Sequence, residues 1–210
     1  MGKIKIGAIA SGSGSNFESI VQSCEDGILK EKASIEVLIC NKPEAYCMER
    51  AKNHNIPYAL IESDEFKGTR EEFDQKMITV LDKYGCELIV LLGYMRFVSK
   101  MFIDHFKGNA MNIHPALLPS FKGMHAHEET LSYGVKISGV TVHFVDPLED
   151  HGPIIIQHAV PVYDTDTKDT LGPRILKWEH KAFPKAIELF CDGRLRIDGR
   201  IVRIDGEVTL

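Results

Sequence analysis

Short apolar runs alternate with amphipathic stretches through the first half of this chain, and this alternation constrains the fold more than any other feature. Runs such as 4–10 and 87–92 have the length of buried strands, whereas Phe73, Met77 and Leu81 fall at helical spacing. Such alternation is typical of parallel strands joined by right-handed helical crossovers. We therefore predict an α/β fold with a doubly wound, mostly parallel sheet. The expected strands are 4–10, 35–40, 57–61, 87–92 and 109–113, and the expected helices are 16–25, 44–53 and 70–84.

The second half of the chain has a different pattern. Residues 136–145 and 153–162 are typical of two longer strands, and a helix is expected over 167–190. A small hairpin is expected at 195–202. We expect these elements to form a mixed extension of the same sheet after a Rossmann-like first half. The predicted organisation is one domain, 1–210, with a boundary between its two halves, 1–110 and 111–210.

Composition and charge narrow the class of protein. The 210 residues are 44% hydrophobic and 26% charged, as in an ordinary globular protein. A net charge of −5 and an isoelectric point near 6.0 argue against a nucleic-acid partner, since polyanion-binding proteins carry a basic excess. We find no signal-peptide pattern and no apolar run as long as a membrane span, so we expect a cytoplasmic protein without a membrane partner. The five scattered cysteines form no C-x-x-C pair, which favours reduced thiols.

The run 112–119 carries the clearest signal for chemistry. Asn112 and His114 are two residues apart, so they point to the same side of an extended strand. Pro115 ends the strand pairing because it has no N–H to donate. An amide donor beside a titratable ring suits the stabilisation of an oxyanion and the movement of a proton. Taken alone, the same residues also allow a buried histidine that is satisfied by the backbone.

A glycine-rich loop, 11–16, follows the first expected strand and opens the first expected helix. Glycines let the backbone approach a ligand closely, and N–H groups at a helix N-terminus attract an anion. Phe17 stands where a dinucleotide-binding loop has its third glycine, and no Walker-type Lys-Ser or Lys-Thr pair follows. One phosphate monoester therefore fits this loop better than a pyrophosphate. The simpler alternative is a tight turn with Ser and Asn caps.

Three other features have both a functional and a structural interpretation. The segment 93–96 follows the fourth expected strand, where it suits a flat aromatic ligand or an ordinary strand-to-helix turn. Asp150 lies in the connection between the two later strands, either folded back toward the same edge or in a turn. Glu179 in isolation is typical of a helix surface. The nine histidines include no H-E-x-x-H motif and no ligand-spaced set, so we expect no metal site.

Together these motifs resemble the phosphoribosylglycinamide formyltransferases, a folate-dependent family within the formyltransferase superfamily. The resemblance runs from residue 3 to about residue 196. The Asn-x-His-Pro-x-Leu-Leu-Pro element with a downstream Asp is specific to the superfamily, and the Ser-Gly-Ser-Gly-Ser-Asn loop narrows the resemblance to this family. In chain order, the matching segments are 11–16, 93–96, 112–119, 142–144, Asp150 and 179–180.

The resemblance implies transfer of a formyl group from 10-formyltetrahydrofolate to the primary amine of glycinamide ribonucleotide, a step of purine synthesis. Attack by the amine creates a tetrahedral oxyanion, which needs donors aimed at the developing charge. By resemblance, Asn112 donates its amide hydrogen, and His114, preferably protonated, supplies the second contact. Asp150 favours the charged imidazole and helps to pass the proton from the amine to the leaving nitrogen.

The resemblance also implies a site for each of two ligands. The ribonucleotide phosphate lies at a helix N-terminus, and the folate occupies a pterin pocket with an arginine that faces its glutamyl carboxylates. The half 1–110 then binds the nucleotide phosphate, while 111–210 carries the catalytic residues and binds folate. The implied ribonucleotide residues are Gly14, Ser15, Asn16 and Glu179, and the implied folate residues are Arg70, Tyr94, Met95, Arg96 and the loop 145–150.

Three alternatives use the same features differently. A formyltetrahydrofolate hydrolase would use Asn112, His114 and Asp150 with water as acceptor, but it normally has an N-terminal regulatory domain that we do not expect here. A methionyl-tRNA formyltransferase would need a further C-terminal domain and a basic surface. A non-enzymatic nucleotide-binding module would leave the three residues without a shared purpose. We expect small-molecule substrates as partners and a monomer or weak homodimer.

Overall fold

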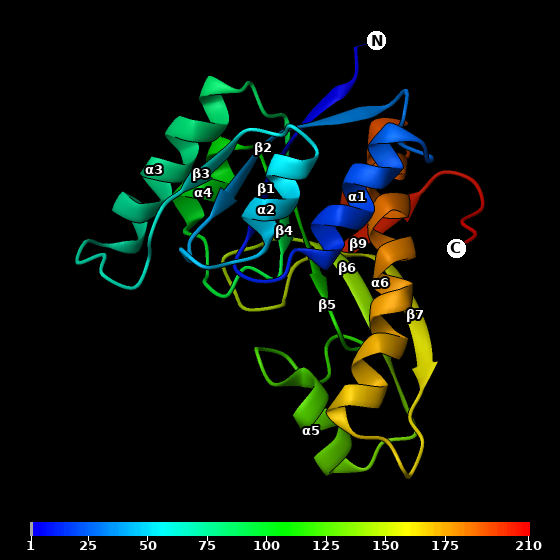
Figure 1. The fold of residues 1–210 in the computed structure, drawn as a ribbon. Coiled ribbons are helices and arrows are strands. Elements are labelled where there is room, and N and C mark those ends of the chain that lie inside the picture. The colour runs from blue at the N-terminus through cyan, green and yellow to red at the C-terminus, as the bar shows by residue number, and fades with distance from the viewer. Residues whose placement is uncertain (1) are drawn as a thin grey trace. The chain divides into compact units, whose positions relative to one another are not determined.

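The structure is a computed structural model that describes residues 2–210. It contains two compact units, Met1–Met111 and Asn112–Leu210. Figure 1 traces the first unit from blue to green and the second from green to red. Between residues 2 and 210, no helix combines the length and the apolar character that a membrane span needs.

The first unit contains a parallel sheet whose connections are helical (Figure 1). Its strands run in the order β3-β2-β1-β4, and each neighbouring pair is parallel. Every residue of β4 is buried, as expected of a parallel strand that is covered on both faces. Loops that follow β1, β2 and β4 therefore leave the same edge of the sheet. The elements are β1 Ile4–Ala10, α1 Ser15–Glu25, β2 Ala33–Cys40, α2 Cys47–Asn53, β3 Tyr58–Leu60, α3 Arg70–Lys83, β4 Leu88–Leu92 and α4 Lys100–His105.

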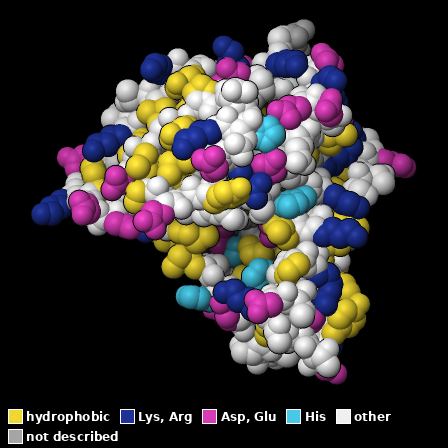
Figure 2. Space-filling model, in the orientation of Figure 1, with side chains coloured by type: hydrophobic (Ala, Val, Ile, Leu, Met, Phe, Trp, Pro, Cys, Tyr) yellow, Lys and Arg dark blue, Asp and Glu magenta, His cyan; other side chains and the backbone are white. Residues whose placement is uncertain are grey.

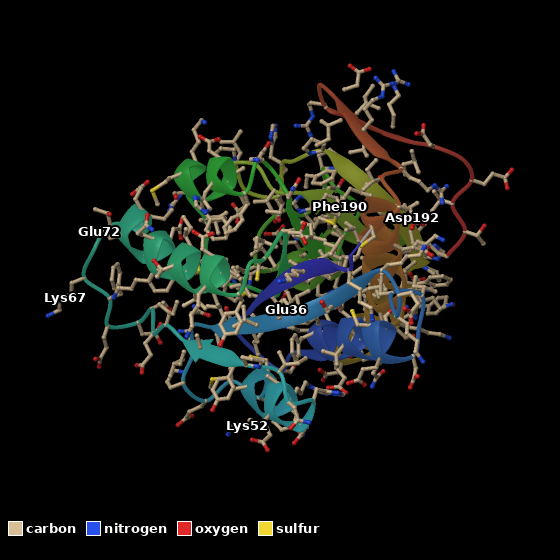
Figure 3. All side chains as sticks on the ribbon, turned by 90° about the horizontal axis from the view of Figure 1, so that it is seen from above. Glu36, Lys52, Lys67, Glu72, Phe190 and Asp192 are labelled. Carbon is tan, nitrogen blue, oxygen red and sulfur yellow. The ribbon has the colours of Figure 1, made fainter. Side chains whose placement is uncertain are left out.

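Local sequence explains where the helices of this unit begin. Thr69 caps α3 in a capping box: its hydroxyl accepts a hydrogen bond from the Glu72 N–H, and the Glu72 carboxylate accepts one from the Thr69 N–H. Figure 3 shows Glu72 at this end of α3 and Lys67 in the loop before it. Helix α4, which has only 6 residues, was not predicted; it begins where the Ser99 hydroxyl accepts from the Phe102 N–H.

The second unit contains the antiparallel strands of the fold (Figure 1). β6 and β7 pair antiparallel, β8 and β9 form an antiparallel hairpin, and β9 joins β7 in parallel through Ile154 and Ile201. Helix α6 packs against β6 and β7 and continues through Pro173 and Pro184. Helix α5 was not predicted. The elements are β5 Ala110–His114, which begins at the boundary of the units, α5 Ala126–Tyr133, β6 Ile137–Phe144, β7 Ile154–Pro161, α6 Lys168–Cys191, β8 Leu195–Asp198 and β9 Ile201–Ile204.

The predicted fold class is confirmed: the chain is α/β, with parallel strands first and antiparallel strands toward the C-terminus. Its surface charge is mixed. On the face drawn in Figure 2, Lys and Arg side chains are interspersed with Asp and Glu. This distribution matches a chain whose net charge is only −5.

Candidate active site

Asp150 joins the two side chains that the sequence places at the end of β5. Its Oδ1 accepts a hydrogen bond from Asn112 Nδ2 at 3.3 Å, and its Oδ2 lies 3.2 Å from His114 Nδ1. His114 is only 4% exposed, so this pairing takes place away from bulk water. The three predicted catalytic residues therefore form one cluster within the second unit.

Each polar atom of this cluster has a partner of the right kind. His143 Nδ1 donates to the Phe144 carbonyl at 2.8 Å, which leaves Nε2 of a neutral ring to accept from Asn112 Nδ2 at 3.3 Å. The two amide hydrogens of Asn112 are thus divided between Asp150 and His143. His114 Nε2 donates to the Phe121 carbonyl at 2.6 Å. A substrate oxygen must therefore share or replace one of these acceptors.

The backbone holds Asp150 in an unusual conformation. Its φ is 42°, in the left-handed region, which costs a residue with a Cβ roughly 1–3 kcal/mol. The Gly123 N–H donates to Asp150 Oδ2 at 2.8 Å, and Phe121, in the same loop as Gly123, also has a positive φ of 52°. Both segments that make this contact therefore contain a left-handed residue with a Cβ. Such backbone strain is common where function depends on geometry.

Burial and charge act in opposite directions on this cluster. Burial lowers the pKa of the His114 imidazole, and the opposing effects of Asp150 and the Phe121 carbonyl do not restore the usual value. Burial raises the pKa of the Asp150 carboxyl, but the neighbouring His143, the charge of His114 and the Gly123 N–H together bring it below the usual value. Both ring nitrogens of His114 nevertheless face acceptors, Asp150 Oδ2 and the Phe121 carbonyl, so the geometry fits the protonated imidazole that the resemblance implies.

Two residues that the sequence analysis did not select fix the chain after His114. The Thr141 hydroxyl on β6 donates to the Ala116 carbonyl at 2.7 Å and accepts from the Leu118 N–H at 3.0 Å. Gln157 on β7 donates to the Leu118 carbonyl at 2.9 Å. The sequence signal for Thr141 was its spacing: it lies two positions before His143 on the same strand, so both side chains point to the same face.

In the first unit, the glycine-rich loop forms the N-terminus of α1. Gly14 is the N-cap with a φ of 71°, and Ser15 is the first helical residue. A Cβ on Gly14 would lie 2.6 Å from the Cys47 Cβ and 2.9 Å from the Cys47 Cα, so no side chain fits there. The structure thus places Gly14, Ser15 and Asn16 at a helix start, as an anion site requires.

A network of charged side chains supports this loop from α2. Arg50 Nε donates to the Ser13 carbonyl at 2.9 Å, and Arg50 Nη1 lies 2.9 Å from Glu18 Oε2. His54 lies between two carboxylates, with its ring nitrogens 2.9 Å from Glu18 and 2.9 Å from Glu25. The Glu18 hydrogen bond, helped by Glu25, raises the pKa of His54 above its usual value despite burial.

This network predicts a pH-dependent part of the stability. Because the folded-state pKa of His54 is raised, its contribution is fully present below the unfolded pKa of about 6.5 and is lost as the pH rises through the folded value. Urea unfolding of wild type and His54→Gln from pH 5 to 9 should show a free-energy difference that shrinks as the pH rises. In a Glu25→Gln background the pH-dependent part should be smaller. A difference that stays constant with pH would contradict this prediction.

Ser11 connects three loops of the first unit. Its hydroxyl donates to Asn41 Oδ1 at 2.6 Å and accepts from the Met95 N–H at 3.0 Å. Asn41 is 1% exposed and donates in turn to the Ser63 hydroxyl at 2.9 Å. The loops after β1, β2 and β4 are therefore tied together by one side chain next to the glycine-rich loop.

One face of α3 holds the segment that follows β4. Residues of α3 at helical spacing each contact a residue of 94–99. The Tyr94 hydroxyl points inward to Met77 Sδ at 3.7 Å, and its side chain is buried, whereas Met95 is 52% exposed. A ligand at this segment therefore meets Met95 and Arg96 rather than the Tyr94 ring. The remaining contacts are the Arg96 guanidinium 4.6 Å from the Phe73 ring, the Ser99 N–H 2.5 Å from Asp74 Oδ2, and the Arg70 guanidinium 5.7 Å from the Phe97 ring.

Glu179 is buried, although its local sequence is typical of an exposed helix surface. It lies in the middle of α6 and is only 7% exposed, so it is not a helix-surface residue. A carboxylate this deep in a helix needs polar partners, since an unpaired buried charge is costly. Within residues 2–210, no set of three or more His, Cys, Asp or Glu side chains is arranged to hold a metal ion. The absence of a metal remains a prediction.

Comparison with known proteins defines the class to which this fold and cluster belong. The sequence model of the family described as Formyl transferase matches residues 4–187, which is most of the chain. The chain therefore belongs to the formyl transferase family, and within it to the phosphoribosylglycinamide formyltransferases.

Three individual relatives place the chain among the phosphoribosylglycinamide formyltransferases. The chain is 35% identical to the phosphoribosylglycinamide formyltransferase of Escherichia coli over 97% of its length and 95% of that protein. It is 41% identical to that of Bacillus subtilis over 88% of its length and 93% of that protein. The crystal structure of glycinamide ribonucleotide transformylase 1 from Symbiobacterium toebii superposes with a TM-score of 0.92 at 42% identity, covering 96% of this chain and 94% of that one. The predicted family is confirmed.

Proposed function

We propose that this enzyme transfers the formyl group of 10-formyltetrahydrofolate to the primary amine of glycinamide ribonucleotide. Formyl transferases of this family use a folate-derived formyl donor, and the relatives named above carry the name of this reaction. The observation that carries the proposal is the Asp150 carboxylate, which contacts both Asn112 and His114 in a strained loop. A single group that orients an amide donor and an imidazole is what acyl transfer to an amine needs.

The chemistry follows from the contacts of these three residues. The amine attacks the formyl carbon, and the carbonyl oxygen becomes an oxyanion. Asn112 turns one amide hydrogen toward this oxygen in place of Asp150 or His143, and His114 offers the N–H that otherwise bonds to the Phe121 carbonyl. Asp150 stabilises the imidazolium and helps to pass the proton from the amine to the leaving folate nitrogen. None of these steps requires a metal or a covalent intermediate.

The two substrates use separate sets of residues in this proposal. Gly14, Ser15 and Asn16 bind the ribonucleotide phosphate at the start of α1, where the helix dipole favours a negative charge. Glu179 hydrogen-bonds the ribose or the glycinamide end of the same molecule. In the second unit, the loop 145–150 is proposed for the pterin ring. In the first unit, the residues proposed for the folate are Arg70, Met95, Arg96 and the backbone of Tyr94.

The deciding experiment follows the loss of the formyl donor by absorbance with and without glycinamide ribonucleotide. We expect consumption of 10-formyltetrahydrofolate only when the amine is present, with equal amounts of formylated ribonucleotide and tetrahydrofolate. Equal consumption without the amine would instead identify the protein as a hydrolase.

The oligomeric state is a separate prediction. In size-exclusion chromatography with light scattering, the same protein should be a monomer or a weak homodimer.

A further inference from the structure

His151, which follows Asp150, is held from both sides. Its Nδ1 lies 2.5 Å from Asp146 Oδ2, and Arg200 Nη1 lies 3.0 Å from its Nε2 and 3.2 Å from its Nδ1. Nδ1 is therefore placed to donate to the carboxylate, and the ring nitrogens lie against the guanidinium. Arg200 Nη2 also donates to the His151 carbonyl at 2.7 Å. The guanidinium therefore binds both the side chain and the backbone of the residue next to Asp150.

Arg200 is presented by a tight turn. β8 and β9 pair up to Asp198 and Ile201, which leaves a loop of two residues, Gly199 and Arg200. Gly199 has a φ of 61° in the first central position, a geometry typical of a type II′ hairpin turn. Ile201, the next residue, pairs with Ile154 at the start of β7. The turn is therefore fixed to the strand that the Asp150 loop enters.

The loop 145–153 needs such support in its middle. Its ends are already fixed: the Phe144 N–H donates to the Pro153 carbonyl at 2.9 Å, and a Cβ on Gly152 would lie 1.8 Å from the Phe144 carbonyl oxygen. Between these ends Asp150 keeps its left-handed conformation. Such strain persists only where surrounding contacts determine the backbone. His151, which contacts Asp146 and Arg200, is the residue directly after the strained Asp150.

We propose that Arg200 is a positioning residue for Asp150 and acts through His151. The inference rests on the proposed function, in which Asp150 is a catalytic residue. The Formyl transferase match ends at residue 187, so the hairpin that carries Arg200 lies outside the matched region. The chain thus uses a segment beyond its family match to fix the loop that completes its catalytic cluster.

The test compares Arg200→Ala with Arg203→Ala. Arg203 lies on the same hairpin, and its guanidinium lies 3.4 Å from the exposed Asp198 side chain, so its loss should leave formyl transfer unchanged. Arg200→Ala should lower kcat about 5-fold, an effect in keeping with an exposed charged contact, with the KM for glycinamide ribonucleotide within about 2-fold of wild type. Arg200→Lys should recover only part of the loss, because lysine lacks the planar fork.

Four outcomes are distinguishable. Wild-type protein without amine-dependent transfer would overturn the proposed function itself. Active wild type with Arg200→Ala and Arg203→Ala equal in kcat would overturn the role of Arg200. A fall in melting temperature with equal changes of kcat and both KM values would also overturn it, since that pattern indicates general destabilisation. A selective loss of single-turnover rate in Arg200→Ala, reduced in a His151→Ala background, would support it.

Discussion

Replacing His114 by alanine is expected to lower kcat for formyl transfer about 10²–10³-fold, the usual effect of removing one oxyanion donor. His114 is 4% exposed, pairs with Asp150 at 3.2 Å and presents its other nitrogen to a carbonyl 2.6 Å away. Alanine removes both the donor to the oxyanion and the charged partner of Asp150. The KM for glycinamide ribonucleotide should change little, because the proposed phosphate site lies at the start of α1. Steady-state kinetics with both substrates varied measures the two effects.

His105→Ala is the matched control for this variant. His105 ends α4, is well exposed, and pairs with Asp82 at 2.9 Å. Its removal should leave kcat within about 2-fold of wild type, since exposed ion pairs contribute little. A His114→Ala protein that folds normally and retains the wild-type kcat would rule out the proposed role of the imidazole.

Replacing Gly14 by alanine is expected to destabilise the first unit and to weaken ribonucleotide binding together. The new Cβ would lie 2.6 Å from the Cys47 Cβ and 2.9 Å from its Cα, in a residue whose φ is 71°. Overpacking and the left-handed backbone together cost about 2–4 kcal/mol. Urea unfolding should show this loss, and the KM for glycinamide ribonucleotide should rise about 10-fold or more as the helix start shifts.

Gly12→Ala provides the control in the same loop. A Cβ on Gly12 has open space within 4 Å, so stability and KM should stay close to wild type. Cys47→Gly should rescue part of the Gly14→Ala loss, because it removes the closer of the two clashing atoms and leaves the backbone contact. Equal effects of the Gly12 and Gly14 substitutions would show that the close approach to Cys47 is unimportant.

Hydrophobic periodicity was sufficient to predict most elements of the fold. The strand predicted at 4–10 coincides with β1 Ile4–Ala10, and the helix predicted at 70–84 differs from α3 Arg70–Lys83 by one residue. These elements bury continuous runs or one clear face, so their patterns are strong. The long helix α6 was also predicted, although Pro173 lies within it.

The two helices that were missed lack such a pattern. α4 has 6 residues, too few to establish a period. α5 has 8 residues, of which only Ala126 and Thr130 are buried, so its sequence does not show an apolar face. Both are held by the chain around them, and tertiary contacts of this kind cannot be read from local sequence.

The candidate site shows the same division between local and distant information. Asn112 and His114 could be paired from strand geometry alone, because two residues on one strand point to one side. Their partner Asp150 is 36 positions after His114, and the sequence alone also allowed a turn aspartate. Thr141, Gln157 and Arg200 were not foreseen, because their roles come from hydrogen bonds to segments distant in sequence.

The hydroxyl of Ser11 has a thermodynamic consequence under the proposed function. Ser11 lies three residues before Gly14 in the proposed phosphate loop, and its hydroxyl accepts a hydrogen bond from the backbone of Met95, which is proposed to contact the folate. It therefore connects the two proposed binding segments. A ligand that immobilises one of these loops reduces the ordering entropy that the other must lose on binding. The two substrates would then bind with positive cooperativity, and each would increase the affinity for the other by the same factor. Ser11→Ala should reduce this mutual enhancement without removing a single contact to either ligand.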